Sequence, residues 1–142
     1  MASMIGVVLG GGLSYLTQLT TQRQANRNED KRQTKALAEA RRAEQLDLLR
    51  QFIQISQRAE RLAEDRDGSS EWVTAAKNVM DDLWACERVI HILFTPTLHE
   101  QARRYVKATN DVLWEEPADV SMWDYLEGPK TNFLDVARTE LA

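Results

Sequence analysis

Hydrophobic residues recur at helical spacing through most of the C-terminal two thirds of the chain. The clearest stripe, in residues 70–94, consists of Trp72, Ala76, Val79, Leu83, Cys86, Ile90 and Leu93. This four-three spacing over three heptads predicts a helix that is buried along one whole side. Similar stripes run from Leu48 to Leu62, widened by a second line of Leu46, Leu49 and Ile53, and from Leu98 to Val112. No stretch alternates like a strand, so the sequence predicts an all-α fold.

Capping and turn residues mark where the helices of this region should begin and end. Asp67-Gly68-Ser69-Ser70 ends the first helix and can cap the second. Thr95-Pro96 supplies an N-cap, followed by proline at the first position of the third helix. Glu115-Glu116-Pro117 then stops that helix. The short connections predict that consecutive helices pack side by side in opposite directions.

The C-terminal end contains a second stop signal. A short helix around Trp123 is expected to break at Gly128-Pro129, because proline lacks the N–H donor that a helix interior requires. A final helix would follow from about Thr131. The residues that this helix is expected to bury are Phe133, Leu134, Val136, Ala137 and Leu141. Residues 46–142 are therefore predicted to form a small antiparallel helical bundle, with core volume supplied by four tryptophans.

The first 22 residues differ from the rest because they contain no Asp, Glu, Lys or Arg. The stretch from Ala2 to Thr20 would span about 28 Å as a helix, close to the roughly 30 Å of a bilayer core. Small residues recur at every fourth position: Ala2, Gly6, Gly10 and Ser14. This is the small-xxx-small pattern through which membrane helices associate. We expect residues 1–22 to be a membrane anchor or assembly helix; a flexible glycine-rich tail is the alternative.

Residues 23–45 follow as a polar stretch without Gly or Pro, and we expect them to form a helical stalk. Residues 23–42 carry seven basic and three acidic side chains, a net charge of +4. By the positive-inside rule, this charge places the C-terminal body in the cytoplasm and the anchor in the cell membrane. The residues expected to contact anionic head groups are Arg23, Arg27, Lys31, Arg32 and Lys35. The alternative is a solvated helix face with i,i+4 charge pairs.

Overall charge limits the possible partners. The net charge of −4 and the pI of about 5.2 argue against nucleic-acid binding. Residues 111–142 carry eight acidic and two basic side chains, a net charge of −6. This acidic region and the basic stalk could attract one another within one chain or between neighbouring chains. The alternative is that the acidic residues simply form a soluble surface.

No arrangement of residues predicts catalysis, a metal site or a cofactor. The only histidines, His91 and His99, are expected to be structural. Glu87 and His91 share a helix face, but their spacing is not the Glu-x-x-His of di-iron bundles. Cys86 is the single cysteine and lies in an apolar stripe, which predicts a buried, unreactive thiol in a reducing compartment. We therefore expect no catalytic residues, no metal, no cofactor and no enzymatic activity.

Two segments, one near each end of the chain, have a recognisable sequence pattern. The glycine-rich start has Gly10-Gly11-Gly12-Leu13-Ser14-Tyr15-Leu16-Thr17-Gln18, and the close has Phe-Leu-x-x-Ala-Arg-x-Glu-Leu from Phe133 to Leu141. With the charged helix after the anchor, these segments resemble small actinobacterial proteins with a Gly-rich membrane anchor and a cytoplasmic helical body. The resemblance implies a bacterial membrane protein that faces the cytoplasm, and it supplies no activity or binding residues.

These patterns favour a membrane-anchored, non-enzymatic scaffold that self-associates through its N-terminal helix. Its expected partners are the membrane, spanned once, further copies of the chain, and a protein whose identity the sequence does not indicate. One alternative is a soluble homo-oligomer or filament with the N-terminal helices as a shared core. Another is a membrane-permeabilising effector in which zippered anchors assemble into a pore.

Overall fold

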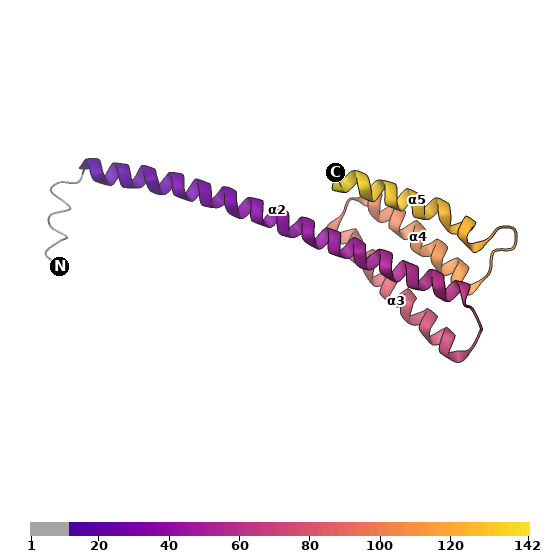
Figure 1. Ribbon diagram of the computed structural model, residues 1–142. Helices are drawn as coiled ribbons and strands as arrows, with labels where there is room; N and C mark the ends of the chain where they lie inside the picture. The colour runs from indigo at the N-terminus through magenta and orange to yellow at the C-terminus, as the bar shows by residue number, and fades with distance from the viewer. Residues whose placement is uncertain (1–11) are drawn as a thin grey trace. The chain divides into compact units, whose positions relative to one another are not determined.

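The computed structural model describes the backbone of residues 12–142 and the side chains from residue 23 onward. The described chain forms four α-helices: α2 (Gly12–Glu64), α3 (Ser70–Leu93), α4 (Pro96–Trp114) and α5 (Met122–Leu141) (Figure 1). The predicted all-α fold with a long first helix is confirmed. The chain divides into two compact units at Ala43/Glu44.

Helix α2 is 53 residues long, and its first described side chains are all in solvent. Every residue from 23 to 44 is exposed, as expected for a polar stalk. The segment is rich in Ala, Gln, Glu, Arg and Lys, which favour helix without tertiary support. Among the described helices, none has an apolar stretch long enough to cross a membrane. The predicted anchor comprises residues 1–22, and its first 11 residues lie outside the described part of the chain.

The bundle of residues 44–142 buries the predicted stripes. In α3 the stripe is buried from Trp72 to Ile90, and in α4 from Leu98 to Val112. In α2, Leu48, Phe52 and Ala59 are buried with them. Three other side chains were expected to be buried or to widen a stripe but are exposed. Their exposed fractions are 43% for Leu46, 37% for Ile53 and 40% for Leu134. The real stripes of α2 and α5 are therefore narrower than predicted.

An aromatic cluster joins three helices at the centre of this core. Phe52 of α2 packs against Phe133 of α5, with ring centroids 4.8 Å apart. Tyr105 of α4 meets Phe52 edge-on at 5.9 Å and lies 6.1 Å from Phe133. Both phenylalanines are fully buried. Offset and edge-on ring pairs add to the stabilisation that comes from area burial alone.

The four tryptophans do not all contribute to the core, so that prediction is wrong. Trp72 is buried and Trp84 half-buried, but Trp114 and Trp123 are 42% and 47% exposed. The reason is their position along the helices. Trp114 is the last residue of α4 and Trp123 the second residue of α5, where the helices leave the core. The two exposed rings become part of the surface described below.

Helix α5 continues through Gly128-Pro129, so the predicted break is also wrong. The missing N–H of Pro129 and its ring cost a helix interior about 3 kcal/mol. However, Leu126 and Phe133 lie seven residues apart on the same side and are at most 1% exposed. Burial of two such side chains contributes about 3–6 kcal/mol. Packing on both sides of the proline therefore outweighs the local cost.

Two glycines should respond differently to the same substitution. Gly128→Ala should change the free energy of unfolding by less than about 0.5 kcal/mol, because alanine favours helix but a Cβ on the residue before Pro129 disfavours the helical backbone. Gly68→Ala should lower it by about 1 kcal/mol, since Gly68 has a φ of 71° that alanine adopts only with strain. Urea unfolding of the full chain, followed by tryptophan fluorescence, measures both. Equal shifts in the same direction would contradict this account.

Candidate functional site

The end of α4 and the start of α5 form a groove with exposed aromatic rings and carboxylates. Its lining consists of Asn110, Asp111, Val112, Trp114, Glu115, Glu116, Pro117, Ala118 and Tyr125. Trp114 and Tyr125 are 42% and 39% exposed. Three lining residues are acidic and none is Lys or Arg. We call this feature the α4–α5 groove. An apolar surface framed by one sign of charge is typical of a docking site for a basic partner.

Both exposed rings of the groove are held in place by neighbouring side chains. Trp114 packs edge-on against Trp72 at 5.8 Å, and its Nε1–H donates to Asn110 Oδ1 at 2.9 Å. The Tyr125 hydroxyl donates to Asp111 Oδ2 at 3.3 Å. Partial burial and then the Asp111 carboxylate raise the pKa of Tyr125. The rings are thus positioned before any partner arrives, which lowers the entropic cost of binding.

The C-terminus of α4 beneath the groove is fixed by an arginine from outside the helix. Arg66 Nε donates to the Leu113 carbonyl at 3.2 Å, and its Nη2 donates to the carbonyls of Val112 and Leu113. Its guanidinium also lies 5.9 Å from the Trp72 ring centroid. These bonds satisfy carbonyls that the helix end leaves free. They tie the groove to the rest of the bundle.

A second hollow adjoins the first. It shares Val112, Glu116 and Pro117 with the α4–α5 groove and adds Trp123 of α5 to the lining. Trp123 is 47% exposed. The exposed aromatic surface therefore extends from α4 across the loop into the first turn of α5.

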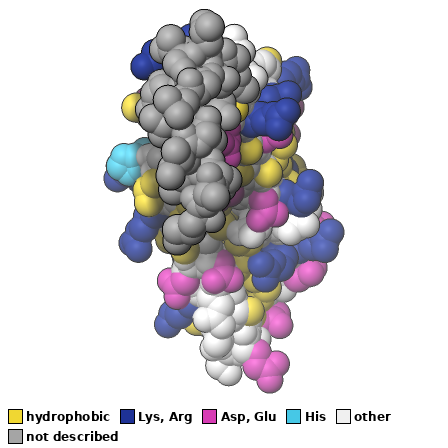
Figure 2. All heavy atoms as spheres, turned by 90° about the vertical axis from the view of Figure 1, so that its left-hand side faces the viewer, with side chains coloured by type: hydrophobic (Ala, Val, Ile, Leu, Met, Phe, Trp, Pro, Cys, Tyr) yellow, Lys and Arg dark blue, Asp and Glu magenta, His cyan; other side chains and the backbone are white. Residues whose placement is uncertain are grey.

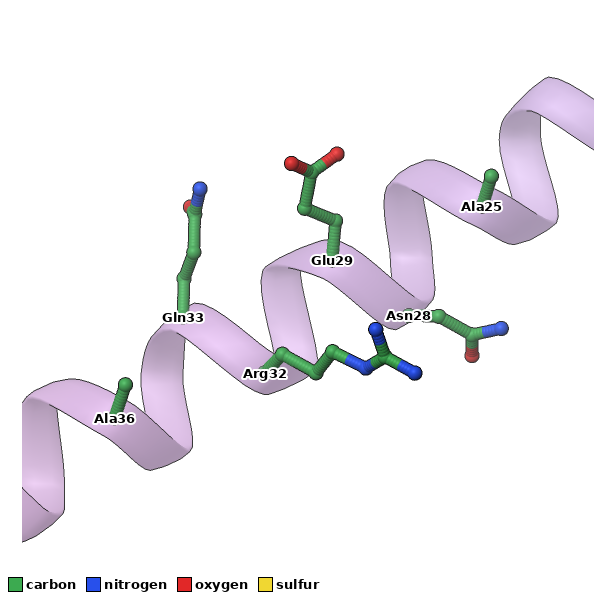
Figure 3. A pocket seen from close by; sticks show the side chains of 6 residues that line it. All are labelled: Ala25, Asn28, Glu29, Arg32, Gln33 and Ala36. Atoms are coloured by element: carbon green, nitrogen blue, oxygen red, sulfur yellow. The ribbon is translucent and has the colours of Figure 1, made fainter.

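The residues predicted to contact lipid lie on the exposed part of α2. Arg23, Arg27, Lys31 and Lys35 are four residues apart and follow one side of the helix, whereas Arg32 lies off this line. A hollow near Arg32 is lined by Ala25, Asn28, Glu29, Arg32, Gln33 and Ala36 (Figure 3). All six come from one helix, which cannot enclose a ligand. Contact with lipid head groups stays a prediction.

The predicted self-association face falls at the N-terminus. Ala2, Gly6 and Gly10 lie outside the described residues. Ser14 lies in α2, but the described side chains begin only at residue 23. Self-association through this face therefore stays a prediction.

A buried carboxylate links three helices inside the bundle. Glu60 of α2 is 3% exposed and accepts a hydrogen bond at 2.5 Å from the Tyr105 hydroxyl of α4. Lys130 of α5 places its Nζ 2.9 Å from Glu60 Oε1 and 3.0 Å from Oε2. Buried charges need such partners, because an unpaired one is costly in a low-dielectric interior. Sequence reasoning missed this group, because Glu60 and Lys130 look like ordinary surface residues in polar runs.

The Tyr105 hydroxyl gives the bundle an alkaline pH dependence. Burial, and next the bond to Glu60, raise the pKa of Tyr105 well above its usual value of 10. The folded state then keeps a proton that the unfolded state loses, so stability should fall as pH rises above about 10. Tyr105→Phe should flatten this decline in the free energy of unfolding. Urea unfolding between pH 8 and pH 11 tests it, with Tyr125→Phe as the exposed control, which should keep most of the decline because the pKa of Tyr125 is raised less than that of Tyr105. An unchanged slope in Tyr105→Phe would contradict the assignment.

The two histidines meet one another and a glutamate. His99 Nε2 lies 2.5 Å from Glu87 Oε1, and the side chains are 17% and 9% exposed. The His91 ring stacks on the His99 ring at 4.0 Å with an interplanar angle of 5°. Parallel rings do not direct their lone pairs to a common point. Over the part of the chain that the structure describes, no group of three or more potential metal ligands converges.

The single cysteine lies inside the bundle. Cys86 is 7% exposed and forms no disulfide. Burial and then the charge of Asp82 raise the pKa of the Cys86 thiol. A raised pKa lowers the thiolate fraction, and the thiolate is the nucleophile. The prediction of a buried thiol is confirmed, and Cys86 does not provide a reactive site.

Charge alone does not single out a binding surface on the face drawn in Figure 2. Basic, acidic and hydrophobic side chains are intermixed there. The α4–α5 groove differs because its lining includes two aromatic rings and all its charged residues are acidic. It is the strongest candidate for an interaction site on the bundle.

Comparisons with known proteins do not change this picture. No protein family, curated protein or solved structure matches the chain.

Proposed function

We propose that this protein is a membrane-anchored, non-enzymatic scaffold. The N-terminal segment would act as a transmembrane helix, the exposed part of α2 as a stalk, and the four-helix bundle as a partner-binding body. The observation that carries the proposal is the fully exposed, basic stretch of residues 23–44. It connects a segment without charged residues to a bundle with a packed core.

The anchor is supported by composition. Residues 1–22 contain no charged side chain, and Ala2, Gly6, Gly10 and Ser14 recur at the spacing of associating membrane helices. The net charge of +4 in residues 23–42 would hold the body on the cytoplasmic side. Basic residues near the surface would add attraction to anionic lipids of about 1 kcal/mol each.

The scaffold role is supported by the surface of the bundle. The α4–α5 groove offers positioned aromatic rings for a protein partner. The two buried glutamates of the described bundle are engaged with other side chains: Glu60 with Tyr105 and Lys130, and Glu87 with His99. None of them is presented to a cavity in the manner of an acid, base or nucleophile.

The anchor is tested by fractionation of the full chain and of a variant that lacks residues 2–22. We expect the full chain to remain in membranes after a carbonate wash, whereas the variant is soluble and keeps the tryptophan fluorescence of a folded bundle. If the full chain stays in the soluble fraction as a large particle, the anchor is refuted. In that case the N-terminal helices would form the core of a soluble assembly.

Self-association through the small-residue face has its own test. Gly6→Leu with Gly10→Leu should lower the yield of chemically cross-linked oligomers in membranes, since the larger side chains prevent close helix approach. Val7→Leu with Val8→Leu is the matched control, because these residues lie off the small-residue face. An equal yield in both double variants would contradict the proposed face.

A further inference from the structure

We propose that the α4–α5 groove binds the basic stalk of a second copy of this chain, with Leu37 and Arg41 of that copy as the contacting side chains. This contact is separate from the N-terminal face and does not depend on the proposed membrane anchor. It would link copies of the chain from bundle to stalk.

The groove defines the chemistry of its partner. Its two exposed rings, Trp114 and Tyr125, need an apolar side chain or a cation above them. Its carboxylates, on Asp111, Glu115 and Glu116, need positive charge nearby. No Lys or Arg lines the groove itself, and Arg66 of the adjoining hollow donates to the carbonyls of Val112 and Leu113. A basic helix with one apolar side chain on its surface would meet both needs of the groove.

Residues 23–42 have these properties. Their net charge is +4, opposite to the −6 of residues 111–142. Leu37 is the one large hydrophobic side chain between residues 23 and 45, and it is 72% exposed. An exposed leucine leaves apolar area in contact with water. Contact between Leu37 and an aromatic ring would remove that area from water, which is favourable. Arg41 follows Leu37 by four residues and so lies on the same side of the helix.

The pairing assigns each side chain a partner by chemistry. Leu37 would cover the apolar part of the groove beside Trp114, and the guanidinium of Arg41 would meet the carboxylates of Glu115 and Glu116. Arginine suits this place because its planar group pairs with carboxylates and stacks on aromatic rings. Arg23, Arg27 and Lys31 lie toward the other end of the stalk and would remain available for lipid.

Photocross-linking of the full chain tests the contact. One preparation carries a photoreactive benzophenone side chain in place of Leu37, and a second, unmodified preparation is labelled with ¹⁵N. The two are mixed in membranes or in buffer, wherever fractionation finds the protein, so a failed anchor does not affect the result. We expect cross-linked pairs in which the labelled copy contributes residues 110–125. The matched control carries the photoreactive group at Glu39, on the opposite side of α2, and should cross-link about five-fold less.

A charge exchange makes the test specific. Glu115→Lys with Glu116→Lys in the labelled copy should lower the cross-linking yield about five-fold, and Arg41→Glu in the photoreactive copy should restore it. Both glutamates are exposed, so the substitutions leave the core intact. Cross-links that join two stalks, that form only within one copy, or that reach other proteins instead would overturn the proposal. So would a yield that the charge exchange leaves unchanged.

Discussion

Phe52→Ala should lower the free energy of unfolding by about 3–5 kcal/mol, the usual cost of removing a large buried aromatic side chain. Phe52 is fully buried and contacts both Tyr105 and Phe133. Its loss would leave a cavity where α2, α4 and α5 meet. Chemical unfolding followed by tryptophan fluorescence reports on the bundle, because all four tryptophans lie between residues 72 and 123.

The neighbouring residue provides a matched control. Ile53→Ala removes a similar hydrophobic side chain from the same helical turn, but Ile53 is 37% exposed. Its cost should be clearly smaller, about 1 kcal/mol, because little of the side chain leaves a packed environment. If the two variants unfolded at the same denaturant concentration, the assignment of Phe52 to the centre of the core would be wrong.

Lys130→Met should lower the free energy of unfolding by about 1–3 kcal/mol. The substitution removes the cation that pairs with the buried carboxylate of Glu60, and Tyr105 alone would remain as its partner. The cost lies below that of a fully buried pair, because the Lys130 side chain is 36% exposed and partly screened by water. Urea unfolding near pH 7 measures it.

A double-mutant cycle separates the ion pair from simple loss of a side chain. Glu60→Gln removes the charge but keeps the shape, and the amide can still accept from Tyr105. Adding Lys130→Met to Glu60→Gln should cost less than Lys130→Met alone, because no buried charge is left unpaired. Lys77→Met, at an exposed position of α3, is the surface control and should change stability by less than about 0.5 kcal/mol. Additive effects of the two bundle substitutions would rule out a direct pair.

The candidate groove illustrates a limit of residue type as a guide. The prediction assigns Trp114 and Trp123 to the core because tryptophan is large and apolar. Both residues stand at helix ends, and the direction in which a helix leaves its neighbours decides whether such a ring is covered. The sequence signal that could have indicated the exposure of these two rings was the acidic composition of residues 111–124. Such a composition is unusual beside a core residue but typical of a surface.

In α5, packing overrides a local sequence signal. Gly128-Pro129 is a strong local stop signal, yet the helix continues because Leu126 and Phe133 are buried on both sides of it. The local helix propensity of proline opposes the helix by a few kcal/mol at most. Burial of two large side chains stabilises the helix by a free energy of similar size. Which of the two prevails depends on the surface against which the helix packs, and that surface is formed by residues far away in sequence.

The sequence by itself determined three of the four described helices, α2, α3 and α4, and most of the core. The four-three stripes of α3 and α4, the caps at Ser69 and Thr95 and the exposed polar part of α2 all follow from local spacing and capping chemistry. These features depend on residues within one or two turns of each other. They can therefore be predicted without knowledge of how the helices pack.

Only the tertiary structure decided which polar side chains meet across helices. Glu60 and Lys130 are 70 residues apart, and Arg66 reaches the carbonyls of Val112 and Leu113 from 46 and 47 residues away. Such pairs leave no periodic mark, since each residue alone looks like an ordinary surface residue. The same holds for the groove, whose lining comes from two helices and the loop between them. Long-range packing places these groups together, and local chemistry cannot reveal it.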